Sequence, residues 1–220
     1  GLMIDLNLGE WSKIHNRKMT AFCKTYDIPL KIVDLKKELG QGICFIKSVL
    51  AKEKGLTGCS VCGTVKKWIL NKWAKKLRAD KLATGHNLDD EAQNVLMNFL
   101  KGNVMLGTSS APKTSKEKGF VPRIKPLFFT PEDEVRKFAK KNKFDILYDR
   151  CPCAFGTYRV ETRAWMKGIT NSEKKKIVTN FQKLAPTLRT QQTKTLQKCK
   201  TCGEPSTRDI CNFCKIMKCI

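Results

Sequence analysis

The sequence predicts an α/β fold with a parallel β-sheet and a small metal-binding module at the C-terminal end. Short segments rich in branched residues alternate with amphipathic helical segments, and glycine-containing loops separate them, as in the βαβ units of a parallel sheet. Two Cys-x-x-Cys pairs follow near the end of the chain. With 220 residues, of which 41% are hydrophobic, the chain can build one packed α/β domain and one small appendage.

Hydrophobic periodicity and turn residues give the order of the elements. The segment 64–79 is a clear helix, because apolar residues recur every four positions from Val65 to Leu77. Thr130 and Pro131 open another helix as N-cap and first helical residue, and this helix ends near residue 141. The other expected elements are strands over 1–8, 29–35 and 81–84, an extended segment over 122–127, and helices over 12–25, 43–52, 88–100 and parts of 158–184.

These elements divide the chain into three predicted parts. Residues 1–157 form the α/β domain, residues 158–197 a basic helical segment suited to an RNA partner, and residues 198–220 the cysteine module. No run approaches the roughly eighteen consecutive apolar residues of a membrane span. The prediction is therefore a protein that does not cross a membrane.

The charge of the chain indicates a polyanionic partner. Lys and Arg number 43 against 20 Asp and Glu, which gives a net charge of +23. Self-repulsion of this size is relieved when the protein binds a polyanion, and nucleic acid is the usual one. A lineage with lysine-rich proteins is the alternative explanation.

The last four paired cysteines predict a structural zinc site. Cys199 and Cys202 form one Cys-x-x-Cys turn, and Cys211 and Cys214 form the second. Two such turns can close a tetrahedron of thiolates around one Zn²⁺ ion, and Gly203 suits the turn after the first pair. Four thiolates leave no open coordination position, so this zinc would brace the fold rather than catalyse a reaction.

A second cysteine pair precedes the helix expected from Thr64. The N–H groups of a helix N-terminus stabilise thiolates, so we expect Cys59 and Cys62 to be acidic and nucleophilic. The pair alone fits a redox dithiol, half of a zinc site or half of an iron–sulfur site. Combined with Cys151, it would bind three irons of a cubane cluster and leave the fourth iron open.

The segment Thr84–Glu91 reads Thr-Gly-His-Asn-Leu-Asp-Asp-Glu and connects an expected strand to an expected helix. Open α/β sheets bind ligands at this place, where Gly85 lets the backbone approach a ligand and the acidic residues can hold Mg²⁺ or a ribose. The alternative is purely structural. His86 would then be a packed loop residue, and the acids would only complement the helix dipole.

These motifs occur in an order that resembles the tRNA 2-thiouridine synthetases, tRNA thiolation enzymes of the pyrophosphatase-loop ATPase superfamily. The matching segments are Cys-Ser-x-Cys-Gly before a basic helix, Thr-Gly-His-Asn-Leu-Asp-Asp-Glu-Ala, Pro-Arg-Ile-Lys-Pro, Cys-Pro and the two C-terminal cysteine pairs. The resemblance covers nearly the whole chain, and several of these motifs are specific to the family.

The resemblance implies a Rossmann-like fold of the adenine nucleotide alpha hydrolase type. It also implies an ATP-dependent tRNA sulfurtransferase that adenylates the C2 oxygen of a uridine, at wobble position 34, and replaces this oxygen with sulfur. The implied partners are tRNA, a sulfur donor (a ubiquitin-like thiocarboxylate protein or sulfide) and a second copy of the chain in the cytoplasm. The implied cofactors are an iron–sulfur cluster (4Fe-4S or 3Fe-4S), ATP with Mg²⁺, and Zn²⁺.

The family's functional positions carry over residue by residue. They fall on Cys59, Cys62 and Cys151 for the cluster, on Lys66 and Asp90 for catalysis, and on Gly85 and Ile4 for ATP. A lysine can screen a phosphate or a developing oxyanion, and an aspartate can bind Mg²⁺ or relay a proton. Under this resemblance, the second cysteine pair belongs to a cluster.

One motif of the family does not occur in the sequence. The Ser-Gly-Gly-x-Asp-Ser loop that holds the ATP pyrophosphate is absent, and so is a zinc module that usually precedes it. Because a strand begins abruptly at Gly1, we expect the chain to start after the first βα unit of the fold. Two alternatives stay open: the related tRNA 2-thiocytidine synthetase, and a non-catalytic RNA-binding protein with a zinc ribbon.

Overall fold

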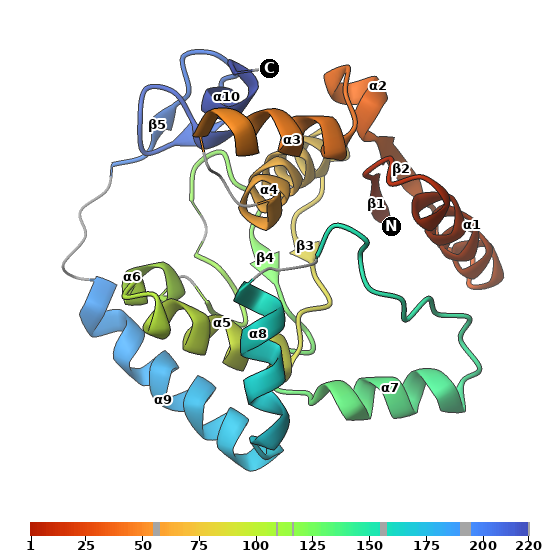
Figure 1. Ribbon diagram of the computed structural model, residues 1–220, viewed down its shortest axis with the longest axis vertical. Coiled ribbons are helices and arrows are strands. Elements are labelled where there is room, and N and C mark those ends of the chain that lie inside the picture. The colour runs from red at the N-terminus through yellow and green to blue at the C-terminus, as the bar shows by residue number, and fades with distance from the viewer. Residues whose placement is uncertain (55–57, 109, 116, 155–157, 190–194, 220) are drawn as a thin grey trace. The chain divides into compact units, whose positions relative to one another are not determined.

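The computed structural model describes residues 1–220 except 55–57, 109, 116, 155–157, 190–194 and 220 (Figure 1). The chain folds into two compact units. Unit 1 comprises Gly1–Leu77, Asn142–Phe155 and Gln197–Ile220, and unit 2 comprises Arg78–Lys141 and Gly156–Leu196. Each unit thus combines segments that are distant in the sequence. The division into 1–157, 158–197 and 198–220 is a functional one and stays a prediction.

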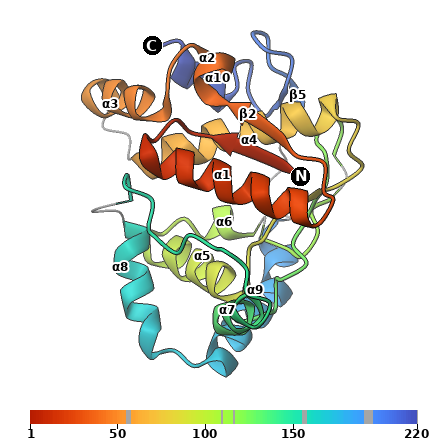
Figure 2. The same ribbon diagram turned by 90° about the vertical axis from the view of Figure 1, so that its right-hand side faces the viewer.

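Unit 1 contains a parallel pair of strands. Strands β1 (Leu2–Asp5) and β2 (Lys31–Asp34) pair in register from Leu2↔Lys31 to Asp5↔Asp34. The crossover helix α1 (Glu10–Thr25) lies alongside this pair (Figures 1 and 2). The other elements of unit 1 are α2 (Leu35–Leu39), α3 (Ile43–Lys54), α4 (Gly58–Lys76), the antiparallel pair β5 (Gln197–Lys198) and β6 (Pro205–Ser206), and α10 (Asn212–Met217).

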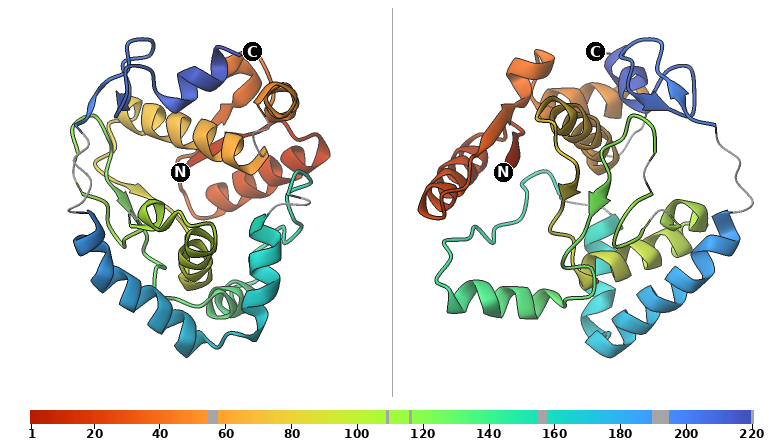
Figure 3. Two further views of the ribbon diagram at one scale, coloured as in Figure 1. Left: turned by 60° about the vertical axis from the view of Figure 1, so that its left-hand side comes forward. Right: turned by 180° about the vertical axis from the view of Figure 1, so that it is seen from behind.

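Helix α4 forms the centre of the unit 1 core. Val65 and Ile69 are fully buried on it and pack with the buried Val33 of β2 and with the C-terminal cysteine segment. Trp68 stacks on Phe213 of α10, with ring centroids 3.9 Å apart and an interplanar angle of 10°. Figure 3 shows α10 beside α4. The C-terminal module therefore shares one core with the helix that carries the second cysteine pair.

Unit 2 contains the second parallel pair, β3 (Leu82–Ala83) and β4 (Arg123–Ile124). Its helix α5 (Leu88–Leu100) contacts both α8 (Tyr158–Trp165) and α9 (Asn171–Arg189) (Figure 3). The buried residues of this core are Leu88, Ala92, Phe128, Met166 and Val178. The remaining elements are α6 (Val104–Gly107), α7 (Glu132–Lys141) and the 3₁₀ helix η1 (Met166–Gly168).

The predicted order of strands and helices is confirmed, and the structure differs from it at several places. The predicted strand 29–35 ends at Asp34, and the unpredicted helix α2 begins at Leu35. Helix α4 begins at Gly58, so the second cysteine pair lies inside the helix rather than before it. The polar connection after α5 contains the short helix α6. Helix α7 begins at Glu132, whose backbone N–H donates to the carboxylate of Asp89 at 2.7 Å. Among the described residues, no helix is long and apolar enough to cross a bilayer.

Candidate functional site

The C-terminal cysteines form a compact group in unit 1. The sulfur atoms of Cys199, Cys202, Cys211 and Cys214 all lie within 4.8 Å of one another. Cys199 directly follows β5, and Cys211 is the N-cap of α10, so two local turns bring the thiols together. Gly203 has a φ of 71°, a left-handed conformation that glycine adopts without strain.

The geometry of this group fits one metal ion. The sulfur atoms of Cys202 and Cys211 are 3.7 Å apart. Metal–sulfur bonds of about 2.3 Å in a tetrahedron place neighbouring sulfurs about 3.8 Å apart, which is nearly the same separation. Backbone N–H groups also point at sulfur, since Cys211 donates to Cys199 at 3.3 Å and Cys214 donates to Cys211 at 3.4 Å. The predicted four-cysteine cluster is therefore a site that could hold a metal ion.

The backbone N–H groups change the pKa values of these thiols by different amounts. Burial raises the pKa of Cys199, but N–H groups of Cys211, Cys202 and Thr201 outweigh it and bring the pKa to about 6. For Cys211 and Cys214, burial dominates and raises the pKa. A metal cation would favour the thiolate form of all four side chains, because thiolates are its ligands.

The structure brings the second cysteine pair and Cys151 together in unit 1. Cys59 is the second residue of α4 and is exposed, whereas Cys62 follows one helical turn later and is half-buried. Cys62 and Cys151 both pack against the unit 1 core, and Cys151 and Cys59 act electrostatically on Cys62. Among the described residues, these three thiols are not gathered within 4.8 Å. The wider spacing differs from that of the C-terminal single-ion site.

The expected acidity of Cys62 is wrong. Burial raises the pKa of Cys62, and the ammonium groups of Lys66 and Lys47 offset only part of this effect. The reason is that α4 begins before the pair, so Cys62 faces the unit 1 core instead of the free N–H groups of a helix end. Lys47 was not among the predicted site residues. It lies on α3, and no local motif connects it to the cysteine pair.

In unit 2, the loop between β3 and α5 holds the predicted aspartate in a defined position. Asn87 caps α5: its side chain accepts from the Asp90 N–H at 3.0 Å, and the Asp90 carboxylate accepts from the Asn87 N–H at 3.4 Å. Arg159 of α8 donates to the same carboxylate at 2.9 Å and to the side chain of Gln93 at 3.1 Å. Arg159 therefore balances the charge of Asp90, and no spacing or motif in the sequence indicates this pairing across 69 residues.

His86 and Gly85 lie in the same loop. The ring Nδ1 of His86 is 2.9 Å from the hydroxyl of Thr84. Desolvation lowers the pKa of His86, Asp90 raises it and Arg159 lowers it, with a net decrease. A Cβ built on Gly85 would meet no atom within 4 Å, so the space beside this residue is open to a ligand. The loop is thus accessible, as a nucleotide site would require.

The other two acids of this run serve the fold. Asp89 accepts from the N–H of Glu132 and, at 2.6 Å, from Lys174. Glu91 is 2% exposed and pairs with Lys125 at 2.7 Å, while the hydroxyl of Ser110 donates to it. Of the three predicted Mg²⁺ or ribose ligands, two therefore have carboxylates that already accept hydrogen bonds or form ion pairs with neighbouring groups of unit 2.

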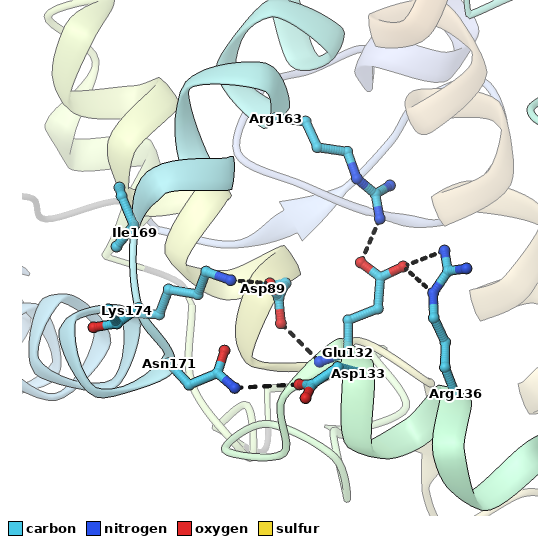
Figure 4. Close-up of a pocket in the computed structure, with 9 residues that line it drawn as sticks. Asp89, Glu132, Asp133, Arg136, Arg163, Ile169, Asn171 and Lys174 are labelled. Carbon is cyan, nitrogen blue, oxygen red and sulfur yellow. Dashed lines mark hydrogen bonds and ion pairs between the residues drawn. The ribbon is translucent and has the colours of Figure 1, made fainter.

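A cavity of about 550 Å³ lies beside Asp89 in unit 2 (Figure 4). Arg136 and Arg163 both reach the carboxylate of Glu132, and Lys174 reaches Asp89. These cations are paired within the cavity wall. Its charge pattern does not by itself indicate a ligand.

Ile4, the predicted adenine contact, is the third of the four residues of β1 and pairs with Val33. It belongs to unit 1, together with Lys66 and the cysteine triad, whereas Gly85 and Asp90 belong to unit 2. The predicted roles of these residues stay predictions.

Comparison with known proteins identifies a family. Residues 2–152 match the PP-loop domain. A probable sulfurtransferase of Methanocaldococcus jannaschii is 34% identical over 219 residues, which is 96% of this chain and 62% of the relative. The tRNA-5-methyluridine(54) 2-sulfurtransferase of Pyrococcus horikoshii is 33% identical over 222 residues, which is 97% of this chain and 68% of the relative.

A solved structure agrees with the sequence matches. The U34-tRNA thiolase NcsA from Methanococcus maripaludis, solved with its 4Fe-4S cluster, superposes with a TM-score of 0.80 at 30% identity. The match covers 99% of this chain and 69% of that one. The chain therefore spans roughly two thirds of the length of these relatives, and the predicted PP-loop ATPase fold is confirmed.

Proposed function

The chain belongs to the PP-loop family, among the tRNA 2-thiolation proteins, and we propose that it acts as an ATP-dependent tRNA sulfurtransferase. ATP activates the C2 oxygen of a uridine as an adenylate, and sulfur displaces AMP to give 2-thiouridine. The observation that carries the proposal is the likeness to the solved U34-tRNA thiolase, with a TM-score of 0.80 over 99% of this chain. The ammonium groups of Lys66 and Lys47 act on Cys62, and positive charge there would attract a sulfur anion.

We assign Cys59, Cys62 and Cys151 to an iron–sulfur cluster of the 4Fe-4S or 3Fe-4S type. Ligands of a cluster bind different irons, so their sulfur atoms lie farther apart than those of a single-ion site. The electrostatic influence of Cys59 and Cys151 on Cys62 supports the proximity of the triad, and its absence from the groups within 4.8 Å among the described residues is compatible with the wider spacing. When bound, the cluster would supply an open iron for sulfide. Lys66 and Lys47 would offset the negative charge of the thiolates.

The catalytic roles fall on Lys66 and Asp90. The exposed ammonium group of Lys66 would stabilise negative charge on a phosphate or on the developing oxyanion. Asp90 would bind Mg²⁺ or relay a proton after Arg159 has released its carboxylate. The open side of Gly85 and the backbone of Ile4 would contact ATP.

The partners follow from charge and from the relatives. The net charge of +23 suits tRNA, and the basic segment 158–197 would contribute to this contact. We propose the wobble uridine, position 34, as the target, a thiocarboxylate protein or sulfide as the sulfur source, and a homodimer in the cytoplasm. Zn²⁺ would occupy the four-cysteine cluster, because four thiolates at tetrahedral spacing are its preferred structural site.

The test begins with anaerobic purification of the protein, followed by iron and zinc analysis and visible absorption spectroscopy. We expect iron–sulfur absorbance that is lost in Cys59→Ser and Cys62→Ser. Cys219→Ser is the matched control, since this thiol donates to the carbonyl of Lys215 and lies outside the triad and the four-cysteine cluster. Colourless protein that contains zinc alone and does not thiolate tRNA would refute the enzyme and favour an RNA-binding zinc protein.

The position of the thiolated uridine is measured separately. Wild-type protein is incubated with tRNA, ATP and sulfide, and mass spectrometry of nuclease fragments locates 2-thiouridine. Sulfur at position 34 supports the wobble assignment. Sulfur at position 54 alone would retain the sulfurtransferase and replace the target.

A further inference from the structure

Two cysteines outside both metal sites lie in direct contact in unit 1. The sulfur atoms of Cys44 and Cys153 are 3.6 Å apart, although 109 residues separate them in the sequence. Cys44 is the second residue of α3 and is exposed, whereas Cys153 lies in the Cys-Pro-Cys segment and is partly exposed. Both thiols are therefore within reach of each other and of small molecules in solution.

The surroundings of this pair are those of a dithiol rather than those of a metal site. The sulfurs of Cys202 and Cys211 are at nearly the same separation, 3.7 Å, but they belong to a group of four thiols. Among the described residues, no third cysteine, histidine or carboxylate has its ligand atom within 4.8 Å of both the Cys44 and the Cys153 sulfur. Two ligands alone do not make a stable zinc site, since structural zinc takes four.

Helix α3 presents Cys44 to solvent and places a cation beside Cys153. Cys44 lies in the first turn of this 12-residue helix and is exposed, so a small disulfide in solution can reach its sulfur atom. Lys47 lies three residues later on the same helix face, and its ammonium group hydrogen-bonds to the Cys153 side chain, which offsets part of the rise that burial causes in the pKa of this thiol. A cation thus lies beside the two sulfur atoms.

We propose that Cys44 and Cys153 form a redox-active dithiol that closes to a disulfide by exchange with low-molecular-weight disulfides. The thiolate of one cysteine attacks the disulfide R–S–S–R, forms a mixed disulfide and releases RS⁻. The second thiolate attacks the protein sulfur of the mixed disulfide, forms the Cys44–Cys153 bond and releases the second RS⁻. The dithiol loses two electrons and two protons, and R–S–S–R is reduced to two thiols.

This inference goes beyond the proposed function, because the disulfide does not require tRNA, ATP or a cluster. An exposed pair of this kind closes and opens readily in a reducing compartment, where lasting structural disulfides are rare. Closure would also tie the segment of Cys151, two residues from Cys153, to α3. Opening or closing of the disulfide would then change the backbone restraint on Cys151, the proposed cluster ligand.

The test uses the full chain, reduced and then equilibrated with mixtures of reduced and oxidised glutathione. Free thiols are blocked with an alkylating reagent, the protein is digested, and mass spectrometry identifies peptides joined by a disulfide. We expect the peptide pair Cys44–Cys153 to appear first as the mixture becomes more oxidising, and reduced dithiothreitol to remove it. In Cys44→Ser and Cys153→Ser this peptide pair is lost, while Cys219→Ser, the matched control, retains it.

Three results of this experiment would contradict the proposed dithiol. Continued alkylation of both thiols in fully oxidised glutathione would overturn the proposal. So would a disulfide between Cys153 and Cys151, or retention of a metal ion by Cys44 and Cys153 after the zinc of the C-terminal cluster has been accounted for. Circular dichroism of each serine variant checks that the fold is intact. Because tRNA thiolation is not measured, a failure here is distinct from a failure of the proposed function.

Discussion

The stack of Trp68 and Phe213 joins the C-terminal cysteine module to the helix that carries the second cysteine pair. Phe213 lies between Cys211 and Cys214 and is 7% exposed. Its ring lies 3.9 Å from the ring of Trp68 at an angle of 10°. We predict that Phe213→Ala destabilises unit 1 although it leaves all four thiols in place.

The magnitude follows from the burial and from the ring contact. Removing a buried phenylalanine side chain costs about 3 to 5 kcal/mol, because apolar contacts are lost and a cavity is left. An aromatic pair adds about 0.5 to 1.5 kcal/mol beyond its buried area. Phe213→Leu keeps most of the volume and loses mainly the stacking, so we expect about 1 to 1.5 kcal/mol for this variant.

The assay is urea unfolding followed by tryptophan fluorescence with excess zinc present. Three of the four tryptophans, Trp11, Trp68 and Trp73, lie in unit 1, so the signal reports mainly on this unit. With a slope of about 2 kcal/mol per molar urea, Phe213→Ala should lower the midpoint by about 1.5 to 2.5 M.

The matched control is Phe99→Ala, because Phe99 is 67% exposed on α5 of unit 2. Its midpoint should change by less than about 0.3 M. A loss below about 1 kcal/mol for Phe213→Ala, or an equal loss for Phe99→Ala, would show that the module does not share its core with α4.

Three further predictions concern the loop of unit 2. Glu91→Ala should cost about 3 kcal/mol in thermal or urea unfolding, because it leaves the partly buried ammonium of Lys125 without its carboxylate; an unchanged midpoint would contradict this. In NMR titrations, the pKa of His86 should fall in Asp90→Asn and rise in Arg159→Gln, because the carboxylate raises this pKa and the guanidinium lowers it. Shifts of the same sign would refute the assignment of these charges. Asp90→Asn should also lower the rate of tRNA thiolation by about 100-fold, measured as 2-thiouridine formed per minute, whereas Arg159→Gln should retain activity; equal rates for wild type and Asp90→Asn would remove Asp90 from catalysis.

The sequence by itself determined the features that depend on short-range geometry. The spacing of Cys199, Cys202, Cys211 and Cys214 is sufficient to predict their grouping, because each Cys-x-x-Cys turn closes over a few residues. Helix α5 spans Leu88–Leu100 as predicted, since its polar start and apolar period are local signals. The order of strands and helices follows from the same kind of evidence, whereas the fold family was implied by the resemblance of the motifs to a known family.

Burial was decided by the tertiary structure. Sequence reasoning predicted an acidic Cys62, yet the core of unit 1 desolvates this thiol and raises its pKa. Phe99 fits the apolar period of α5 and is nevertheless 67% exposed, because the other helices of unit 2 pack against different faces of α5. A periodic pattern identifies an apolar face, but only packing decides how much of that face is covered.

Long-range pairing was decided in the same way. Arg159 reaches Asp90 over 69 residues, and Cys153 reaches Cys44 over 109 residues. No spacing in the sequence encodes such contacts, because they arise when separate helices and loops pack into one unit. The sequence thus identified which cysteines and acids can carry chemistry, and the tertiary structure decided which charges and thiols each of them faces.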